Sequence, residues 1–463
     1  MPLALRPLLL LAVATRCRGA WPLLADSALN VTEIIFSRES SGAFLGSPSV
    51  VRLPAGSRAI LASHDWFGAG PPAYPHDVAE VLSAPAAGGA FARVGAGAGL
   101  YWATLFERSA AVPGDSGVYL MGVSSDDGAR AAISIARSGD GGVTWAPSPA
   151  AVLARNATSA YSTGPTPVLL WAGRLWRAYE HNLGAWASGY ACVVASAPAD
   201  AADLTAPAAW TLSGELPFAA VRDLVPSAWN NASGGYNVDG SFGWLEGNAV
   251  QPEDAADPGI YIMLRVQAGP TGNKAALLHL AGPTATPAFR QWVDLPGGQT
   301  KFTVRRDAAT GLYVTLSNAV GGARRDSVTL PPACGPVALP PGHTPLPCCG
   351  FLRECSTAPV ATCLWCHSAA RNNLTLVVAP RAAGPWTAVA TVLADDTGTP
   401  DYMSELQTGF QYADFVFDGA DIIASVRAGY RGANNYHNAN RHLLKIIPNW
   451  RALVPKQAVL AST

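Results

Sequence analysis

The sequence predicts an all-β fold, a six-bladed β-propeller of four-stranded antiparallel blades that is closed by an N-terminal strand. The first observation is a repeat: an apolar segment, a glycine turn and two β-rich segments recur six times along 463 residues. The second is that each β-rich segment alternates apolar and polar residues, as half-buried strands do. A repeat of roughly 50 to 60 residues buries its apolar faces only by stacking on its neighbours, and six such sheets close into a ring.

The strands of each blade follow in order along the chain. Inner strands that line the central channel are expected at 46–53, 101–107, 163–170, 245–250, 300–304 and 409–417. Second strands, each beginning a few residues after a glycine, are expected at 59–63, 119–123, 175–179, 260–266, 312–318 and 421–427. Third strands are expected at 78–84, 129–138, 190–198, 274–281, 372–380 and 441–449. The sixth repeat lacks an outer strand, and the segment 30–37 before the first repeat predicts the strand that completes it and covers the open edge.

The remaining segments predict an exported protein. Residues 1–20 place Arg6 before a short apolar run, which is typical of a secretory signal and too short to span a bilayer. Four glycosylation sequons begin at Asn30, Asn156, Asn231 and Asn373. We therefore expect a signal peptide at 1–20, a single propeller at 21–463, and a secreted or lumenal location. The net charge of −1 offers no basic face for a nucleic acid, and no integral membrane segment is predicted.

Cysteines support the same compartment. Six of the eight lie in the proline-rich block 334–366, which predicts a disulfide-stapled insertion in a top-face loop of blade 5. A zinc site of Cys363, Cys366, His343 and His367 is the alternative for this block. Cys192 lies in a predicted strand and is expected to be a buried free thiol.

The repeat brings reactive residue types to one end of the channel. The inner strands begin with residues that direct Tyr101, Glu246, Lys301 and Tyr412 towards one axial pocket. Such groups are costly to bury without a partner or a task. The loops over this face carry further polar side chains, among them His64 and His437. Glu246 and Lys301 also suit a purely structural ion pair across the channel, and the two histidines suit ordinary hydrogen-bonded loop residues.

One motif connects this repeat to a family. Residues 138–145, Ser-Gly-Asp-Gly-Gly-Val-Thr-Trp, lie between the third and fourth strands of blade 2 and match the pattern S-x-D-x-G-x-T-W. This pattern resembles the Asp box of the sialidase superfamily, a structural turn on the face opposite the site. A second, worn version lies at 379–386 in blade 5. The resemblance extends over nearly the whole chain after residue 20.

The resemblance implies a set of site residues. Glu246 and Arg265 look like the family's glutamate on the fourth inner strand and the arginine that follows it, and Tyr412 looks like its nucleophilic tyrosine. Arg371 looks like the third substrate arginine. The family's acid comes from the top loop of the first blade, where Asp77 and Asp65 both lie. Of the two, Asp77 is slightly favoured because it lies nearer the third strand.

The chain departs from the family at the first blade. Where sialidases carry Arg-Ile-Pro, this sequence has Gly46-Ser47-Pro48, so the arginine that clamps the substrate carboxylate is missing. Lys301 offers a different positive charge on the fifth inner strand. The fold and a sugar-like substrate are therefore expected more firmly than sialic acid itself.

Three functions follow from these residues. The first is a secreted retaining glycoside hydrolase that removes a terminal acidic sugar, with Tyr412 as nucleophile, Glu246 as base and an aspartate as acid. The second is a polysaccharide lyase for uronate-containing glycans, for which His64, His181, His437 and Lys301 are available. The third is a glycan-binding propeller without turnover. All three take a glycan partner, no cofactor or metal is demanded by any motif, and the sequence leaves the oligomeric state open.

Overall fold

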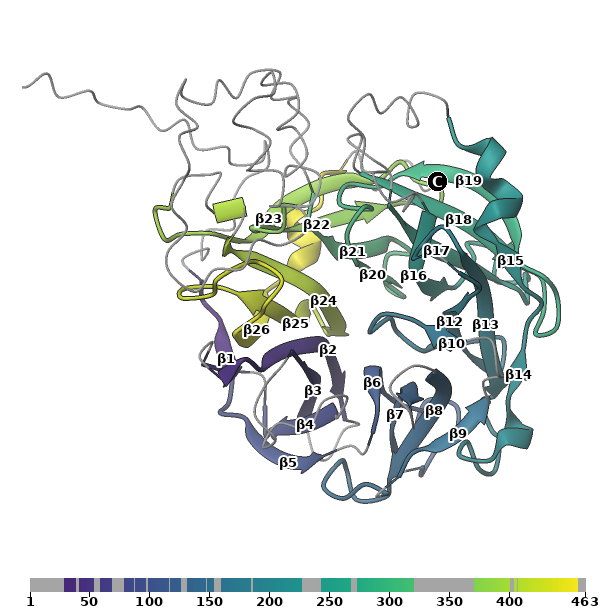
Figure 1. The fold of residues 1–463 in the computed structure, drawn as a ribbon, viewed down its shortest axis with the longest axis horizontal. Helices are drawn as coiled ribbons and strands as arrows, with labels where there is room; N and C mark the ends of the chain where they lie inside the picture. The colour runs from purple at the N-terminus through teal and green to yellow at the C-terminus, as the bar shows by residue number, and fades with distance from the viewer. Residues whose placement is uncertain are drawn as a thin grey trace, which may run out of the picture.

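The chain forms six antiparallel sheets arranged as a ring (Figure 1). The computed structural model describes residues 29–38, 41–53, 59–68, 79–86, 88–96, 99–115, 117–125, 131–146, 148–153, 160–184, 186–226, 243–267, 273–319, 370–399, 404–405 and 407–456. The predicted signal peptide, the cysteine-rich block, Asn156, Asn231 and Asp77 lie outside these residues.

Each blade is built from consecutive strands, ordered from the channel outwards. Blade 1 contains β2 (Phe44–Arg52), β3 (Ile60–Phe67), β4 (Ala79–Ala84) and β5 (Ala92–Ala96), and blade 2 contains β6 (Tyr101–Glu107), β7 (Val118–Ser125), β8 (Ala131–Ser138) and β9 (Ala150–Leu153). Blade 4 contains β16 (Gly243–Val250), β17 (Ile260–Gln267), β18 (Lys274–Leu280) and β19 (Ala288–Asp294). Blade 5 contains β20 (Thr303–Arg306), β21 (Tyr313–Ser317), β22 (Asn373–Ala379) and β23 (Thr387–Ala394). The predicted six-bladed propeller is confirmed.

Blade 3 differs from the prediction because its inner strand is interrupted. Instead of one strand at 163–170, two short strands, β10 (Ala160–Ser162) and β11 (Leu169–Trp171), both pair with β12 (Arg174–Asn182). Pro165 and Pro167 stand between them, and proline cannot donate a ladder hydrogen bond. The rest of the blade is β13 (Tyr190–Pro198) with the short outer strands β14 (Thr211–Leu212) and β15 (Leu216–Pro217). A further difference is that blade 5 begins its inner strand at Thr303, so Lys301 lies just before it.

Ring closure follows the prediction. Blade 6 consists of β24 (Gly409–Asp418), β25 (Asp421–Gly429) and β26 (Arg441–Ile447), and β1 (Thr32–Phe36) pairs antiparallel with β26 as its outermost strand (Figure 1). Both ends of the described chain therefore belong to one sheet. The edge that blade 6 would otherwise expose is covered.

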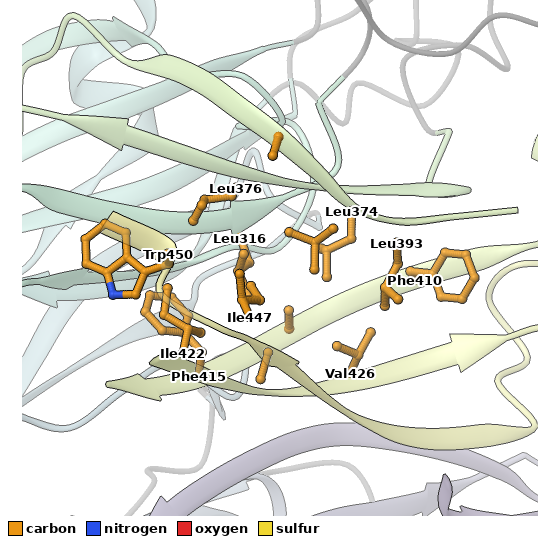
Figure 2. Packing of buried hydrophobic residues seen from close by; sticks show 14 of the residues in the cluster. Leu316, Leu374, Leu376, Leu393, Phe410, Phe415, Ile422, Val426, Ile447 and Trp450 are labelled. Atoms are coloured by element: carbon orange, nitrogen blue, oxygen red, sulfur yellow. The ribbon is translucent and has the colours of Figure 1, made fainter. Parts of the chain in front are cut away.

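The core is divided among the contacts between neighbouring blades. Each pair of adjacent blades shares its own cluster of buried apolar side chains. Figure 2 shows the cluster between blades 5 and 6, where Leu316 and Leu374 of one sheet face Phe415 and Val426 of the other. In the part of the chain that the structure describes, none of the helices is long and apolar enough to cross a bilayer.

The turn at 138–145 lies where the motif predicts, between β8 and β9. Ser138 Oγ donates to Asp140 Oδ1 at 2.7 Å, and Asp140 Oδ1 accepts the Thr144 amide at 2.8 Å. The Trp145 indole donates to Gly142 O at 2.9 Å. In the corresponding turn of blade 5, the Trp386 indole donates to Ala382 O at 3.1 Å. Hydrogen bonds within each turn stabilise it, as expected of structural elements.

A bulge opens the inner strand in four of the six blades. Strand register shifts between Gly46 and Ser49, Tyr101 and Thr104, Leu245 and Asn248, and Gln411 and Asp414. The first extra residue in each bulge has a positive φ: 33° at Ser47, 51° at Trp102, 58° at Glu246 and 56° at Tyr412. A bulge re-aims the side chain of the residue that it inserts. Four blades thus present one redirected side chain each at the same end of the channel.

A ring of polar residues, the polar belt, lies beneath these positions, and in the four bulged blades its member follows the bulge residue by two positions. Its members share complete burial and are Ser49, Thr104, Thr166, Asn248, Thr303 and Asp414. Ser49 Oγ donates to Asp414 Oδ2 at 2.9 Å, and Thr104 Oγ1 donates to Thr166 O at 2.8 Å. Asn248 Nδ2 donates to Phe302 O at 3.0 Å. These bonds join neighbouring blades directly beneath the redirected side chains.

Candidate functional site

Tyr412, Glu246 and Arg265 form a hydrogen-bonded chain at the top of the channel. The Tyr412 hydroxyl donates to Glu246 Oε1 at 2.8 Å, and Arg265 Nη1 donates to Glu246 Oε2 at 2.8 Å. Arg265 Nε is fixed by Gln299 O at 2.7 Å. Because the arginine occupies one oxygen of the carboxylate, the other oxygen is directed at the phenol. Glu246 pairs with Arg265 and not with Lys301, so the structural ion pair considered as an alternative does not form.

Two further guanidinium groups face the ring of Tyr412. Arg371 Cζ lies 5.6 Å and Arg427 Cζ 5.1 Å from the ring centroid. Burial and the charge of Glu246 raise the pKa of Tyr412, although Arg265, Arg371 and Arg427 oppose the shift. The phenol is therefore neutral at physiological pH and needs a base before it can attack.

Asp65 is buried above Gly46 in blade 1. Its Oδ2 accepts the Trp102 amide at 2.8 Å. Burial raises its pKa, which bonds from Trp102 and Ser47 and the charge of Arg427 only partly counteract. A Cβ at Gly46 would lie 2.0 Å from Asp65 Oδ1. The glycine thus provides the space that the carboxylate occupies, which explains why no side chain stands there.

The second strands contribute charged groups from equivalent positions. Asp65 pairs with Gly46, Arg265 with Leu245 and Arg427 with Gln411, in each case opposite the residue that precedes the bulge. Arg427 was not identified from the sequence. The repeat contained the signal, because Arg265 and Arg427 both lie near the ends of their predicted second strands.

Glu180 is a second group that sequence reasoning missed. It is fully buried in β12, and its Oε1 accepts the Gly247 amide at 2.9 Å. Its Oε2 has no hydrogen-bond partner among the described residues. Burial raises the pKa of Glu180 to about 8, and the charge of Glu246 adds to the shift. Glu180 therefore holds a proton at neutral pH and braces the bulge that presents Glu246.

Lys301 and Tyr101 lie near the site in roles that differ from those predicted. The Lys301 ammonium donates to Thr303 Oγ1 at 2.8 Å and to the carbonyls of Tyr412 and Ala413 at 3.3 and 3.1 Å. It thus supports the backbone behind the tyrosine. Trp102, not Tyr101, is the bulge residue of blade 2, because the one-residue offset of the bulge cannot be read from composition. Tyr101 contacts Trp102 edge to face, with ring centroids 4.8 Å apart.

The two predicted histidines are separated by the structure. His64 is buried between blades 1 and 6, where its Nε2 lies 3.5 Å from Glu80 and its ring 5.7 Å from that of His442. His437 lies beside Phe67, with ring centroids 5.2 Å apart, and its carbonyl accepts from Arg427 Nη2 at 2.5 Å. Burial and the nearby arginines lower the pKa of His437 to about 3. His437 therefore borders the tyrosine cluster as a neutral ring, while His64 packs within the fold.

No group of three or more His, Cys, Asp or Glu side chains in the described segments is arranged to hold a metal ion. The cluster around Tyr412 instead offers a phenol with a base, a buried carboxyl whose pKa is raised, and several guanidinium groups. Groups of these types are chemically able to transfer protons, attack carbon and bind anions.

Comparison with known proteins extends only to the fold. No protein-family model matches the chain, and no curated protein matches it. An α-L-arabinofuranosidase from Fusarium graminearum, solved with an iminosugar inhibitor, aligns with 92% of this chain and 99% of its own at 9% identity and a TM-score of 0.51. A Hadza microbial sialidase aligns with 92% of this chain and 69% of its own at 9% identity and a TM-score of 0.53.

A mutant of Trypanosoma rangeli sialidase that displays trans-sialidase activity aligns with 96% of this chain and 61% of its own, at 9% identity and a TM-score of 0.50. At these identities the comparisons bear on architecture alone. The chain has the six-bladed propeller fold that these proteins share.

Proposed function

We propose that this protein is a glycoside hydrolase that removes a terminal acidic sugar with retention of configuration. The observation that carries the proposal is the 2.8 Å hydrogen bond from the Tyr412 hydroxyl to a carboxylate whose other oxygen is held by Arg265. This arrangement supplies a neutral nucleophile with its own base. Such a pair suits a substrate whose negative charge would repel a carboxylate nucleophile.

The proposed reaction uses three side chains. Glu246 accepts the phenol proton while the Tyr412 oxygen bonds to the anomeric carbon and the bond to the leaving oxygen breaks. Asp65 gives its proton to that oxygen, in keeping with the raised pKa of its buried carboxyl. In the second half, water adds to the anomeric carbon, gives one proton to Asp65, and the tyrosine oxygen leaves and regains its proton from Glu246.

Asp77 is the other candidate for the acid and lies outside the described residues. We favour Asp65, because burial raises the pKa of its carboxyl and because Gly46 leaves the space that the carboxylate occupies. The proposal also keeps the exported location, which rests on residues 1–20 and the sequons.

The test is release of sugar from a panel of acidic glycans and aryl glycosides by the purified protein and by Tyr412→Phe. We expect the wild-type protein to release a saturated monosaccharide and the variant to lose this activity. Tyr261→Phe is the matched control, because it removes a phenol in β17 that contacts His279. Asp65→Asn should lower the rate by about 10²- to 10⁴-fold, the usual contribution of a general acid.

Other outcomes would point to the other functions. An unsaturated, ultraviolet-absorbing product would identify a lyase. Glycan binding without release, equal in the wild-type protein and Tyr412→Phe, would identify a binding propeller.

A further inference from the structure

Two glycosylation sequons lie among the described residues, and the structure places them differently. Asn30 begins the sequon Asn-Val-Thr just before β1, and Asn373 begins the sequon Asn-Leu-Thr as the first residue of β22. Both motifs carry the same chemistry, so the sequence alone does not separate them. A glycan is bulky and polar, and it requires an asparagine at an open surface.

The sequon at Asn30 lies open at the outer edge of blade 6 (Figure 1). Asn30 is exposed, and no described residue forms a hydrogen bond with its side-chain amide. Its backbone carbonyl accepts a hydrogen bond from Lys445 Nζ at 3.1 Å, which fixes the main chain at this point. Among the described strands, β1 pairs with β26 and has no neighbour on its outer side. The open side of this edge strand gives a glycan at Asn30 room.

The sequon at Asn373 is closed by comparison. Its strand β22 is an interior strand that pairs with β21 and β23 on its two sides. Asn373 is half-buried, and Thr375 of the same sequon is 1% exposed, whereas Thr32 of the first sequon is half-buried. Asn373 also follows Arg371, which borders the ring of Tyr412, by two residues. A glycan there would push against the strands on either side and stand beside the site.

Asn30 lies towards the opposite face of the propeller from Tyr412. Residues paired across blade 6 form a row at the level of Tyr412, which runs through Gln411, Arg427, His442 and Ile35. Thr32 precedes Ile35 by three residues, which is about 10 Å of strand away from that level. Asn30 lies beyond Thr32 in the same direction, so a glycan attached to it leaves the top of the channel open.

We infer that Asn30 carries an N-linked glycan on the folded protein and that Asn373 does not. The donor is an oligosaccharide joined to a lipid through pyrophosphate. The side-chain nitrogen of Asn30 bonds to the anomeric carbon of this oligosaccharide and gives up one proton. The bond from that carbon to the pyrophosphate oxygen breaks, and the lipid pyrophosphate leaves with the electron pair. The inference rests on the proposed export of the chain and does not depend on the reaction proposed for Tyr412.

Mapping of the glycan sites tests this inference on the full chain. The protein is expressed with residues 1–20 in cultured mammalian cells, collected from the medium, denatured, and treated with peptide N-glycosidase in water labelled with heavy oxygen. The enzyme converts each glycosylated asparagine into an aspartate that carries the label, and peptide mass spectrometry locates it. We expect the label at Asn30 in most molecules and none at Asn373.

Two substitutions at Thr32 form a matched pair. Thr32→Ser keeps the sequon and should keep the label at Asn30, whereas Thr32→Ala removes the hydroxyl and should abolish the label. Asn30→Gln changes no residue of β1 and removes the amide that would be modified. It should migrate faster than the wild-type protein in electrophoresis by one glycan, and it decides the question if Thr32→Ala does not fold.

The outcomes that contradict the inference are distinct. Secreted wild-type protein without the label at Asn30, a label at Asn373, or a label retained at Asn30 in Thr32→Ala would each overturn it. A chain that stays in the cells without a glycan would overturn it together with the proposed export. Tyr412→Phe separates it from the proposed function, because this variant should lose the release of sugar and keep the glycan at Asn30.

Discussion

Replacing Gly46 by alanine tests whether this glycine exists to accommodate Asp65. The added Cβ would lie 2.0 Å from Asp65 Oδ1 and 3.3 Å from Phe67 Cδ1, so the carboxylate has to move. Overpacking of this kind costs about 1–3 kcal/mol. Movement of the carboxylate also leaves the partly buried Trp102 amide, whose hydrogen bond it now accepts at 2.8 Å, without that acceptor, at a cost of about 1–3 kcal/mol. We expect Gly46→Ala to lower the free energy of unfolding by about 2–6 kcal/mol.

The decisive measurement is a double-mutant cycle. Urea unfolding followed by tryptophan fluorescence gives the free energies of the wild-type protein, Gly46→Ala, Asp65→Ala and the double variant. Because Asp65→Ala removes the clashing oxygen, the added methyl group should cost less than about 1 kcal/mol in that background. Gly282→Ala, where a Cβ meets nothing within 4 Å, is the control and should stay within about 0.5 kcal/mol of wild type. An equal cost of Gly46→Ala in both backgrounds would refute the reasoning.

Three other predictions concern groups beneath the site. Glu180→Gln should flatten the pH dependence of stability. In the wild-type protein the folded-state pKa of Glu180, about 8, exceeds the ordinary 4.5, so the free energy of unfolding falls as pH rises between these values, by up to about 1.4 kcal/mol per pH unit. Urea titrations at pH 5 to 8 measure this slope in both proteins. Lys301→Met should lower the unfolding free energy by about 1–3 kcal/mol, because the carbonyls of Tyr412 and Ala413 lose a donor; an unchanged urea midpoint would contradict this. Cys192 should resist alkylation by iodoacetamide at pH 8 until urea unfolds the chain, because burial raises the pKa of its thiol and excludes the reagent; modification of the folded protein would show otherwise.

Sequence patterns predicted most of the architecture because strand periodicity and repeat length are properties of the whole blade. The second and third strands lie within a few residues of their expected ranges, and the strand that closes the ring is β1, as predicted. The error in blade 3 arose at Pro165 and Pro167, where apolar composition suggested a strand but the backbone lacks the donors to pair.

The site was only partly predictable, because it depends on single-residue offsets. Tyr412, Glu246 and Arg265 could be located by resemblance, and the structure brings them together. Trp102 was missed because the bulge shifts the redirected position by one residue from Tyr101. Arg427 was missed because an arginine near the end of a strand has the same composition whether it faces solvent or a neighbouring ring. A comparison of repeats position by position, and not of each motif alone, would have found it.

The four bulges have a consequence for how such a protein can change. Each bulge presents one side chain at an equivalent position of its blade. The paired strands and the polar belt below are held by contacts that do not involve that side chain. The residue at a bulge position can therefore change without a change in the strand pairing of the sheet that carries it. The four bulge positions already hold serine, tryptophan, glutamate and tyrosine, all with a positive φ. A new reaction in this scaffold requires substitutions at a few bulge positions, while the strands that orient those side chains stay the same.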